Sequence, residues 1–489
     1  MHAVCGGNTQ WRFVQIFLLF ILIGSAGCKG GSEDDATDVP EPTPSTSSQV
    51  AFWLTNPDRS ALFARQTAAL NFTSISNQHP TIVVDSAKTY QSIDGFGYTL
   101  TGGSAYVLHR MKAAERAAAL HELFATDDKN IGVSYLRVSI GASDLSSFAF
   151  TYDDLPIGQT DPEMQQFSLE HEETDLIPVL NEILAINPSI KILGSPWTAP
   201  EWMKTNNSYV GGHLKPEYYD AYARYFVKYI QGMQAKGIPI DAITVQNEPL
   251  NPYNNPSMEM SAAEQADFIK YSLGPAFKAA NLATKIIVYD HNADRTDYPI
   301  TILEDPEANK YVDGTAFHLY GGNIAALSAV HQAYPDKNIY FTEQWVGAPS
   351  NFSGDLAWHV NNLIIGATRN WSRTVLEWNL AADQNQEPHT NGGCSNCLPA
   401  VTVNSNGTVT RNTAYYIIAH ASKFVRPGSI RLDSNVPAGL QNVAFLNPQG
   451  QKVLIVLNTN TAPQTFNISY RGKAVTTTLQ QGAVGTYVW

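Results

Sequence analysis

The sequence predicts an α/β fold: a (β/α)₈ TIM barrel with a side β-sandwich domain built from the C-terminal region and N-terminal strands. Eight strand-like runs alternate with helical stretches or long loops over residues 93–419, an alternation typical of a parallel sheet that closes into a barrel. Beyond residue 419, short alternating strands such as Val453–Leu457 recur between Gly, Asn and Pro turns, which indicates a β-sandwich over residues 420–489. The chain has 489 residues, 44% of them hydrophobic, so it can fill both cores.

Each barrel strand is predicted from a short run that is rich in β-branched or aromatic residues. The eight runs are Gly95–Leu100, Ser134–Ile140, Lys191–Pro196, Ala242–Glu248, Lys285–His291, Gly314–Tyr320, Asn338–Glu343 and Thr374–Asn379. Short runs before the barrel, such as Thr81–Asp85, have no helical partners. We therefore expect residues 50–92 to add strands to the sandwich.

Three helices between these strands are predicted from their end signals and composition. Pro216 begins one that ends near Gly237, because proline is favoured in the first turn and glycine after the last. Ser261 and Glu264 form a capping box in front of a second helix. The third is the alanine-rich run from residue 113 to residue 125.

Residues 1–28 have the features of an export signal. Arg12 precedes the apolar run Phe13–Ile23, which is too short to span a bilayer, and small residues then lead to Cys28. This pattern resembles the signal peptide of a bacterial lipoprotein, in which Cys28 becomes the acylated first residue of the mature chain. An ordinary cleaved signal peptide is the alternative.

The segment 29–49 is rich in Pro, Ser, Thr and Asp and is predicted to be a disordered linker. Its acidic run Ser32–Asp35 resembles the tag that directs some lipoproteins of Gram-negative bacteria to the cell surface, although a solvated tether would have the same composition. We expect an exported lipoprotein of the outer membrane, on the cell surface, which meets the membrane only through its lipid anchor. We also expect it to be a monomer.

The composition argues against a nucleic-acid partner. The formal net charge is −13, whereas phosphate backbones are bound by basic patches. Charged residues make up 15% of the chain and aromatic residues 11%, a balance that suits a secreted globular enzyme with aromatic-lined clefts. A neutral substrate such as a glucan is compatible with this charge.

Two cysteines lie outside the leader, Cys394 and Cys397, in a loop rich in Gly and Asn. In an oxidising compartment such a pair is expected to form a small-loop disulfide. A metal site would need further ligands, and only His389 is near in the sequence, so we predict no metal.

Two glutamates follow buried strand-like runs and carry the predicted chemistry. Glu248 ends the run from Ala242 and is followed by Pro249, which cannot continue a strand ladder; Glu343 ends the run from Asn338. On a parallel barrel two such carboxyls can face each other across one pocket, which is the arrangement that cleaves glycosidic bonds. With carboxyls about 5–5.5 Å apart the reaction retains the anomeric configuration, Glu248 acting as acid/base and Glu343 as nucleophile. The alternative is that each is a surface glutamate after a strand.

Other strand ends carry polar and aromatic groups suited to the rim of a substrate site. Arg137 could hold a carboxylate or form a structural salt bridge, and Trp197 could stack on a sugar or pack in the core. For His318 a structural role is the alternative. The complete set of predicted substrate-binding residues is Arg137, Trp197, Asn247, His318, Tyr320 and Trp378. The sequence has no Gly-rich phosphate loop, no zinc-type His-Glu-x-x-His and no Gly-x-Ser-x-Gly elbow.

Together these motifs resemble glycoside hydrolase family 30, which contains glucosylceramidases and β-1,6-glucanases. The motifs that carry the resemblance are Gly95–Gly97, Ser195–Pro200, Ala223–Lys228, Asn247–Pro249, His318–Tyr320, Phe341–Glu343 and Trp378–Leu380. The resemblance implies a retaining mechanism without a cofactor, and it implies the same roles for Glu248 and Glu343.

One departure from the family pattern bears on the substrate. Glucosylceramidase-like members have Thr-Asp after the first strand, whereas this chain has Thr101-Gly-Gly103. The resemblance implies that this Asp grips the outer hydroxyls of a terminal glucose, so its absence here predicts an endo-β-1,6-glucanase. The alternatives are a β-glucosidase or glucosylceramidase that releases terminal glucose, a xylanase, and a non-catalytic surface glycan-binding lipoprotein.

Overall fold

The structure, a computed structural model, describes residues 48–127 and 129–489. The predicted signal peptide, the lipidation site Cys28 and nearly all of the predicted linker lie outside these residues. Within the described part of the chain, no helix is long and apolar enough to cross a membrane.

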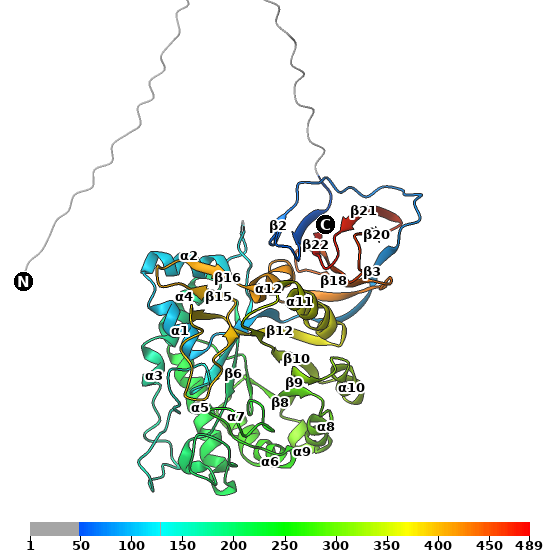
Figure 1. Cartoon of the computed structure of the whole chain (residues 1–489). Helices are drawn as coiled ribbons and strands as arrows, with labels where there is room; N and C mark the ends of the chain where they lie inside the picture. Colours follow the sequence, from blue (N-terminus) through cyan, green and yellow to red (C-terminus); the bar gives the residue numbers. More distant parts are fainter. Residues whose placement is uncertain (1–47, 128) are drawn as a thin grey trace, which may run out of the picture. The chain divides into compact units, whose positions relative to one another are not determined.

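Eight parallel strands close into a barrel, as predicted (Figure 1). Its strands follow the chain in order and run β4 Gly95–Thr99, β5 Tyr135–Ile140, β6 Lys191–Pro196, β7 Ala242–Thr244, β8 Lys285–Ala293, β9 Val312–Gly322, β10 Asn338–Glu343 and β12 Ser372–Asn379. The last strand, β12, pairs with the first, β4, through Thr374 and Gly95. This closure leaves the barrel sheet without a free edge.

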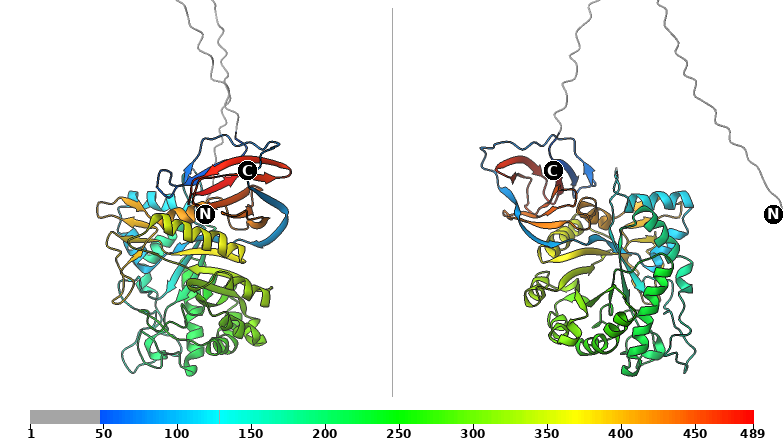
Figure 2. Two further views of the ribbon diagram at one scale, coloured as in Figure 1. Left: turned by 45° about the vertical axis from the view of Figure 1, so that its right-hand side comes forward. Right: turned by 180° about the vertical axis from the view of Figure 1, so that it is seen from behind.

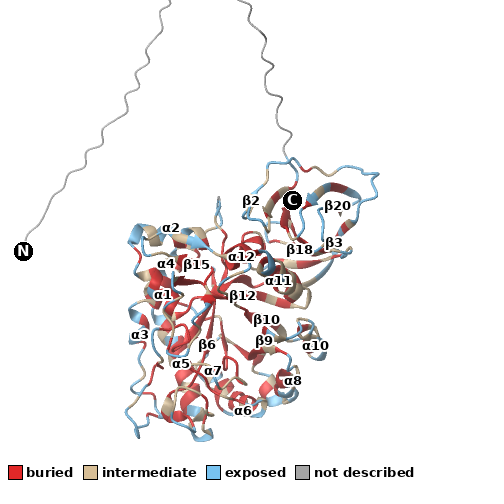
Figure 3. Ribbon diagram, viewed as in Figure 1, coloured by how far each residue is buried: buried red, intermediate tan, exposed pale blue. Residues whose placement is uncertain are grey.

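The interior of the barrel is built in two layers that follow the two-residue period of a strand. The lower layer is a plug of seven buried side chains, Tyr135, Leu193, Ala242, Ile287, Ala316, Tyr340 and Leu376. Two residues further along six of these strands stand Arg137, Ser195, Thr244, His318, Thr342 and Trp378. The second layer is therefore mostly polar, and it lies towards the carboxyl ends of the strands. Figure 3 shows the barrel strands buried along most of their length.

Strand β8 departs from this period. Tyr289 pairs with Ala316 and His291 with Phe317, so one extra residue, Asp290, is inserted between them. Both Tyr289 and Asp290 have positive φ angles, of 75° and 62°, and a bulge of this kind redirects a side chain. Because of it, Asp290 rather than Tyr289 joins the polar layer.

Helices surround the barrel on the outside (Figures 1 and 2). Their bounds are α1 Gly102–His109, α2 Ala113–Phe124, α3 Glu170–Glu173, α4 Leu176–Ile186, α5 Tyr219–Ala235, α6 Ala262–Phe268, α7 Gly274–Ala279, α8 Asp297–Glu304, α9 Pro306–Asn309, α10 Ala326–Ala333, α11 Phe352–His359 and α12 Thr413–Ser422. The three predicted helices correspond to α2, to α5 preceded by a 3₁₀ turn that starts at Pro216, and to α6. The predicted capping box is present, since the Ser261 hydroxyl accepts from the Glu264 N–H and the Glu264 carboxylate accepts from the Ser261 N–H.

A nine-stranded mixed sheet forms the second domain, in the order β2-β1-β22-β19-β18-β17-β3-β20-β21. Its strands pair antiparallel except for β3 and β20, which are parallel. Its strands are β1 Ala51–Thr55, β2 Ala64–Arg65, β3 Thr81–Ser92, β17 Ile430–Ser434, β18 Leu440–Leu446, β19 Lys452–Asn458, β20 Gln464–Tyr470, β21 Lys473–Leu479 and β22 Val484–Val488. Phe466 of β20 packs on Tyr487 of β22, five places away in this order, so the sheet folds over itself into a sandwich. N-terminal and C-terminal strands lie side by side in it, blue and red in Figure 1.

The predicted boundary between residues 419 and 420 falls inside a helix. Helix α12 runs from Thr413 to Ser422 and packs on barrel strand β4 and on sandwich strand β22. The predicted change from helices to strands at residue 420 therefore cuts through the C-terminal half of this helix. A boundary just after α12 follows from the structure.

His420 joins the two domains. Its Nδ1 lies 2.8 Å from Thr486 Oγ1 and its Nε2 lies 2.8 Å from Thr55 Oγ1. The Thr486 hydroxyl donates to the His420 carbonyl, so it must accept from an Nδ1–H, and the Thr55 hydroxyl is left to donate to Nε2. Burial lowers the pKa of His420 to about 3, which fits this neutral imidazole.

The neutral state of His420 predicts a pH dependence of stability. The unfolded chain protonates His420 below pH ~6.5, while the folded protein does so only near pH 3. Below pH ~6.5 the free energy of unfolding should therefore fall by about 1.4 kcal/mol per pH unit through this group. Urea unfolding at pH 5 and pH 7 should show this slope, and a His420→Gln variant should lose it. Equal slopes in parent and variant would contradict the assignment.

Candidate active site

A cleft of about 420 Å³ opens at the carboxyl ends of the barrel strands. It is lined by Asp144, Glu248, Leu250, Asn251, Asn254, His291, Asn292, Tyr320, Glu343, Trp345, Trp378, Cys394 and Cys397. A larger cavity of about 700 Å³ lies beside α1, between Tyr106 and Asn406. Of the two, the cleft contains the buried, paired carboxyl groups, and ligand sites of parallel barrels lie at this end of the strands.

Glu248 reaches the cleft on a segment that has left its strand. We predicted a strand from Ala242 to Glu248, but β7 ends at Thr244, so the longer strand is wrong. Glu248 has φ 44°, in the left-handed region, which a strand cannot contain. The segment is nevertheless fixed, because Asn247 N–H donates to Pro196 O and Glu248 N–H donates to Asp290 O.

Glu343 is the last residue of β10 and is held by two donors. Arg137 Nη1 donates to its Oε2 at 2.5 Å, and the Tyr320 hydroxyl donates to its Oε1 at 3.0 Å. Burial and the carboxylates of Glu248 and Asp290 raise the pKa of Glu343, while His318 and Arg137 favour its ionised form. The ion pair with Arg137 and the hydrogen bond from the Tyr320 phenol together orient the Glu343 carboxylate towards the cleft.

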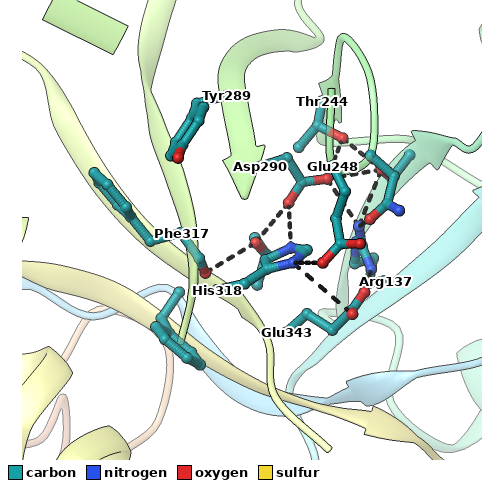
Figure 4. A network of polar contacts seen from close by, with 12 residues as sticks. Arg137, Thr244, Glu248, Tyr289, Asp290, Phe317, His318 and Glu343 are labelled. Carbon is teal, nitrogen blue, oxygen red and sulfur yellow. Dashed lines mark hydrogen bonds and ion pairs between the residues drawn. The ribbon is translucent and has the colours of Figure 1, made fainter. Parts of the chain in front are cut away.

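Beneath the two glutamates, Asp290 collects hydrogen bonds from the surrounding strands (Figure 4). One oxygen accepts from Arg137, Ser195 and Thr244 at 2.7–2.8 Å, and the other accepts from Thr342 at 2.6 Å. Although burial opposes ionisation, Arg137 and His318 hold the pKa of Asp290 well below its usual range. Asp290 is therefore a fully buried anion whose lone pairs are occupied.

His318 links Asp290 to both cleft glutamates (Figure 4). Its Nε2 lies 3.1 Å from Asp290 Oδ1, and its Nδ1 lies 3.2 Å from Glu248 Oε1 and 3.8 Å from Glu343 Oε1. Burial alone would lower the pKa of His318, but the three carboxylates raise it to about 9. The His318 imidazole is therefore protonated and positively charged, and it lies between the two glutamates.

This proton determines the state of Glu248. Although burial disfavours its ionisation, the hydrogen bond and charge of His318, with His291 and Asn251, lower the pKa of Glu248 to about 2. In the free cleft the proton therefore rests on His318, at the histidine end of a 3.2 Å contact with Glu248. To act as an acid in catalysis, Glu248 must take up this proton itself. Burying an ion pair is costly, so a ligand that excludes water favours the neutral pair in which Glu248 donates to Nδ1.

The carboxyl groups of Glu248 and Glu343 are close neighbours. One ligand atom each from Glu248, His318 and Glu343 lies within 4.8 Å of the other two, which is also the spacing of metal ligands. Each of these groups already has a partner, and Arg137 places a positive charge on Glu343. We therefore assign the cluster to acid–base chemistry rather than to a metal.

The structure separates the predicted site residues into two groups. Glu248, Tyr320, Glu343 and Trp378 line the cleft. The others lie behind its wall: Arg137, Trp197, Asn247 and His318. Arg137 Nη2 donates to Asn247 Oδ1 at 2.7 Å. Trp197 is 1% exposed and packs on Trp378, ring centroids 5.4 Å apart, so it supports the indole that meets the cleft.

Asp144 is a cleft residue that the sequence analysis missed. It is 6% exposed, and burial together with the charges of Glu343 and Glu248 raises its pKa to about 7. A carboxyl there can exchange hydrogen bonds with a sugar hydroxyl. Asp144 lies four residues beyond the end of β5, outside any periodic pattern. The one signal in the sequence that could have identified it as a site residue is its position in the loop after this strand, seven residues beyond Arg137.

The structure also corrects the role given to the loop Thr101-Gly-Gly103. Gly102 does not line the cleft; it begins α1 and lines a separate cavity with Ser146 and Phe148. The cleft has a carboxyl in any case, from Asp144. The absence of a carboxylate at Gly102 therefore gives no argument for cleavage inside the glucan chain, and that part of the prediction is wrong.

The predicted disulfide is present between Cys394 and Cys397. The sequence placed these cysteines only in a Gly- and Asn-rich loop. In the structure both line the cleft. Trp345, two residues after Glu343, also contributes to this wall.

Comparisons with known proteins agree with this geometry. Residues 93–425 match the family model described as the glycosyl hydrolase family 30 TIM-barrel domain, and residues 428–487 match the glycosyl hydrolase family 30 beta sandwich domain. An endo-1,6-β-D-glucanase of Aspergillus fumigatus is 38% identical over 396 residues, covering 76% of this chain and 79% of that protein. The lysosomal acid glucosylceramidase of Mus musculus is 28% identical and covers 83% of each chain.

A solved structure is similar over nearly its whole length. It is an endo-β1,6-glucanase, with a TM-score of 0.84 at 38% identity, and the match covers 91% of this chain and 99% of that one.

The network makes a prediction about His318. Replacing Asp290 with Asn removes a charge 3.1 Å from Nε2, so the pKa of His318 should fall from about 9 by about one unit or more. NMR titration of the protein labelled with ¹⁵N-histidine would measure it, with the signal assigned from a His318→Gln variant. Asp313→Asn, at the amino end of β9, is the matched control and should leave this pKa unchanged. An unaltered pKa in the Asp290→Asn protein would contradict the network.

Proposed function

The chain belongs to glycoside hydrolase family 30, and we propose that it is a retaining endo-β-1,6-glucanase. The observation that carries the mechanism is the spacing of Glu248 and Glu343, which each place one carboxyl oxygen within 4.8 Å of the other's. Retaining glycosidases hold their two carboxyls about 5–5.5 Å apart, whereas inverting ones need about 6.5–9.5 Å to admit a water molecule. Double displacement through a covalent glycosyl-enzyme follows from the short spacing.

In the first step Glu343 attacks the anomeric carbon as the glycosidic oxygen leaves. Arg137 and the Tyr320 hydroxyl hold the carboxylate in place, so little reorganisation is needed as the bond forms. Glu248 protonates the leaving oxygen, using the proton that it shares with His318. Asn251 Nδ2 donates to the other Glu248 oxygen at 2.8 Å and orients the carboxyl.

In the second step a water molecule releases the sugar from Glu343. Glu248, now ionised, takes a proton from this water. His318 Nδ1 then lies beside both the regenerated carboxyl of Glu248 and the departing carboxylate of Glu343. The Nε2 contact with Asp290 keeps the imidazole in one orientation through both steps.

The β-1,6 linkage is supported by the relatives rather than by a contact in the cleft. An endo-1,6-β-D-glucanase at 38% identity and a solved endo-β1,6-glucanase at the same identity cover most of the chain. A glucosylceramidase is 28% identical, so release of terminal glucose is the competing activity.

We also propose that the enzyme is a lipoprotein of the Gram-negative outer membrane, exposed on the cell surface and anchored at Cys28. The support is the leader sequence, in which Arg12, an apolar run and small residues precede this cysteine. A polysaccharide too large to cross the outer membrane must be cleaved outside it.

The first test is a time course of products from linear β-1,6-glucan. Mixed oligosaccharides should appear early, and NMR of the fresh products should show the β-anomer first. Glu343→Gln should lower the rate by about 10⁴-fold or more, because it removes the nucleophile. Glu264→Gln, the same change in the α6 capping box, is the matched control and should retain full activity.

Three results would contradict the proposal. Glucose as the sole early product would make the enzyme an exo-acting glucosidase. An initial α-anomer would show that the spacing of Glu248 and Glu343 had been misinterpreted. Retention of glucan without hydrolysis, by parent and Glu343→Gln alike, would indicate a glycan-binding lipoprotein.

The anchor is tested separately in a Gram-negative host. The parent should incorporate radiolabelled palmitate, fractionate with the outer membrane and be digested by protease added to whole cells. Cys28→Ser should lose the label and the membrane association while its glucanase activity persists. A mature parent protein with an unmodified N-terminus in mass spectrometry would show an ordinary signal peptide instead.

A further inference from the structure

The Cys394–Cys397 disulfide lies in the wall of the cleft, although no step of the reaction uses it. Both cysteines line the cavity that contains the two catalytic glutamates. Cys397 is 4% exposed. One apolar cluster joins it to the cleft aromatics; its members are Leu145, Trp197, Trp378 and Cys397, with Trp345 and Cys394 at the edge.

Residues 388–398, here named the cysteine loop, run directly against Asp144. The Thr390 N–H donates to the Asp144 carbonyl at 2.9 Å and the Thr390 hydroxyl donates to the same carbonyl at 3.3 Å, while the Cys394 backbone N–H favours the ionised form of the Asp144 carboxyl and lowers its pKa. A Cβ added at Gly393 would lie 2.3 Å from this carbonyl, so only glycine permits the approach. The position of Asp144 in the cleft therefore depends on the cysteine loop.

The same loop is tied to two other walls of the cleft. Cys397 pairs with Gly347, and the Ala348 N–H donates to the Asn396 carbonyl at 2.8 Å, which connects the loop to the segment after Trp345. On the other side the Thr390 hydroxyl donates to the Asn255 carbonyl at 2.6 Å, in the loop that follows Glu248. The cysteine loop thus bridges segments that follow β5, β7 and β10.

The loop's own sequence would leave it flexible. Gly392 and Gly393 precede Cys394, and Gly392 has φ +87°; consecutive glycines lose the most conformational freedom on ordering. The disulfide closes a ring with a sequence separation of only 3. Disulfides constrain the unfolded chain less when the loop is short, so the effect of this one is chiefly local.

We propose that the Cys394–Cys397 disulfide is a positioning element of the active site, which keeps the Asp144 carboxyl and the aromatic wall in place for the bound sugar. The inference rests on the glycosidase activity and not on the β-1,6 linkage. Glu248 and Glu343 are held by Arg137, Tyr320, His318 and Asn251, none of them in the cysteine loop. The loss of the disulfide should therefore weaken substrate binding more than the chemical step.

The test compares the Cys394→Ser/Cys397→Ser double variant with the parent. Rates are measured on linear β-1,6-glucan or an aryl β-glucoside, whichever the parent hydrolyses faster, so that an error in the linkage does not affect the result. We expect kcat/KM to fall about ten- to a hundredfold, mainly through KM. Ser395→Ala, an exposed residue inside the ring, is the matched control and should change neither constant.

A further comparison shows whether the disulfide acts through Asp144. Asp144→Asn is combined with the double cysteine variant, and the combined loss should be smaller than the product of the separate losses. If the double variant does not fold, the folded parent is reduced with dithiothreitol and alkylated, and the same rise in KM is expected. An unchanged kcat/KM without the disulfide, or fully multiplicative losses with Asp144→Asn, would overturn the proposal.

Discussion

One buried anion, Asp290, constrains the barrel around it. A buried carboxylate without partners would cost several kcal/mol, and Asp290 avoids this cost through five donors. These donors come from five different strands: Arg137 on β5, Ser195 on β6, Thr244 on β7, His318 on β9 and Thr342 on β10. A one-residue slip of any of these strands would turn its donor away. The network therefore specifies the register of the barrel and at the same time orients the two side chains, Arg137 and His318, that contact Glu343 and Glu248.

The two glutamates differ in their partners more than in their burial. Glu343 contacts a guanidinium and a phenol, groups that keep their protons near neutral pH, so its carboxylate is available for attack. Glu248 contacts His318, whose proton can reside on either side of their hydrogen bond. The proposed nucleophile and the proposed proton donor thus differ because of what lies behind each side chain, although one carboxyl oxygen of Glu248 lies within 4.8 Å of one of Glu343. None of the cleft-lining residues belongs to the β-sandwich, which contacts the barrel through α12 and through hydrogen bonds such as those that Arg369 donates to the carbonyls of Ser434 and Asn442.

The barrel, its strand order and the meeting of Glu248 and Glu343 in one cleft could be predicted from the sequence. The runs were recognisable because buried parallel strands are continuous apolar segments bounded by helix signals, and strand ends on such a barrel share one face. The two-residue period also places Arg137, His318 and Trp378 above the apolar plug. Local pattern failed at two backbone positions with positive φ. The strand before Glu248 ends at Thr244, four residues earlier than predicted, and the bulge at Asp290 brings this aspartate to the centre of the site.

What the sequence determined by itself is therefore the architecture and the chemical type of the site, since both depend on spacing along single strands. The tertiary structure decided which residues meet in the cleft. Asp144, Cys394 and Glu248 belong to loops after different strands, and their distances depend on closure of the barrel and on hydrogen bonds between those loops. Gly102 shows the same limit: it follows the first strand in the sequence, yet the turn into α1 takes it out of the cleft. No periodic pattern encodes such contacts, because they join segments more than a hundred residues apart.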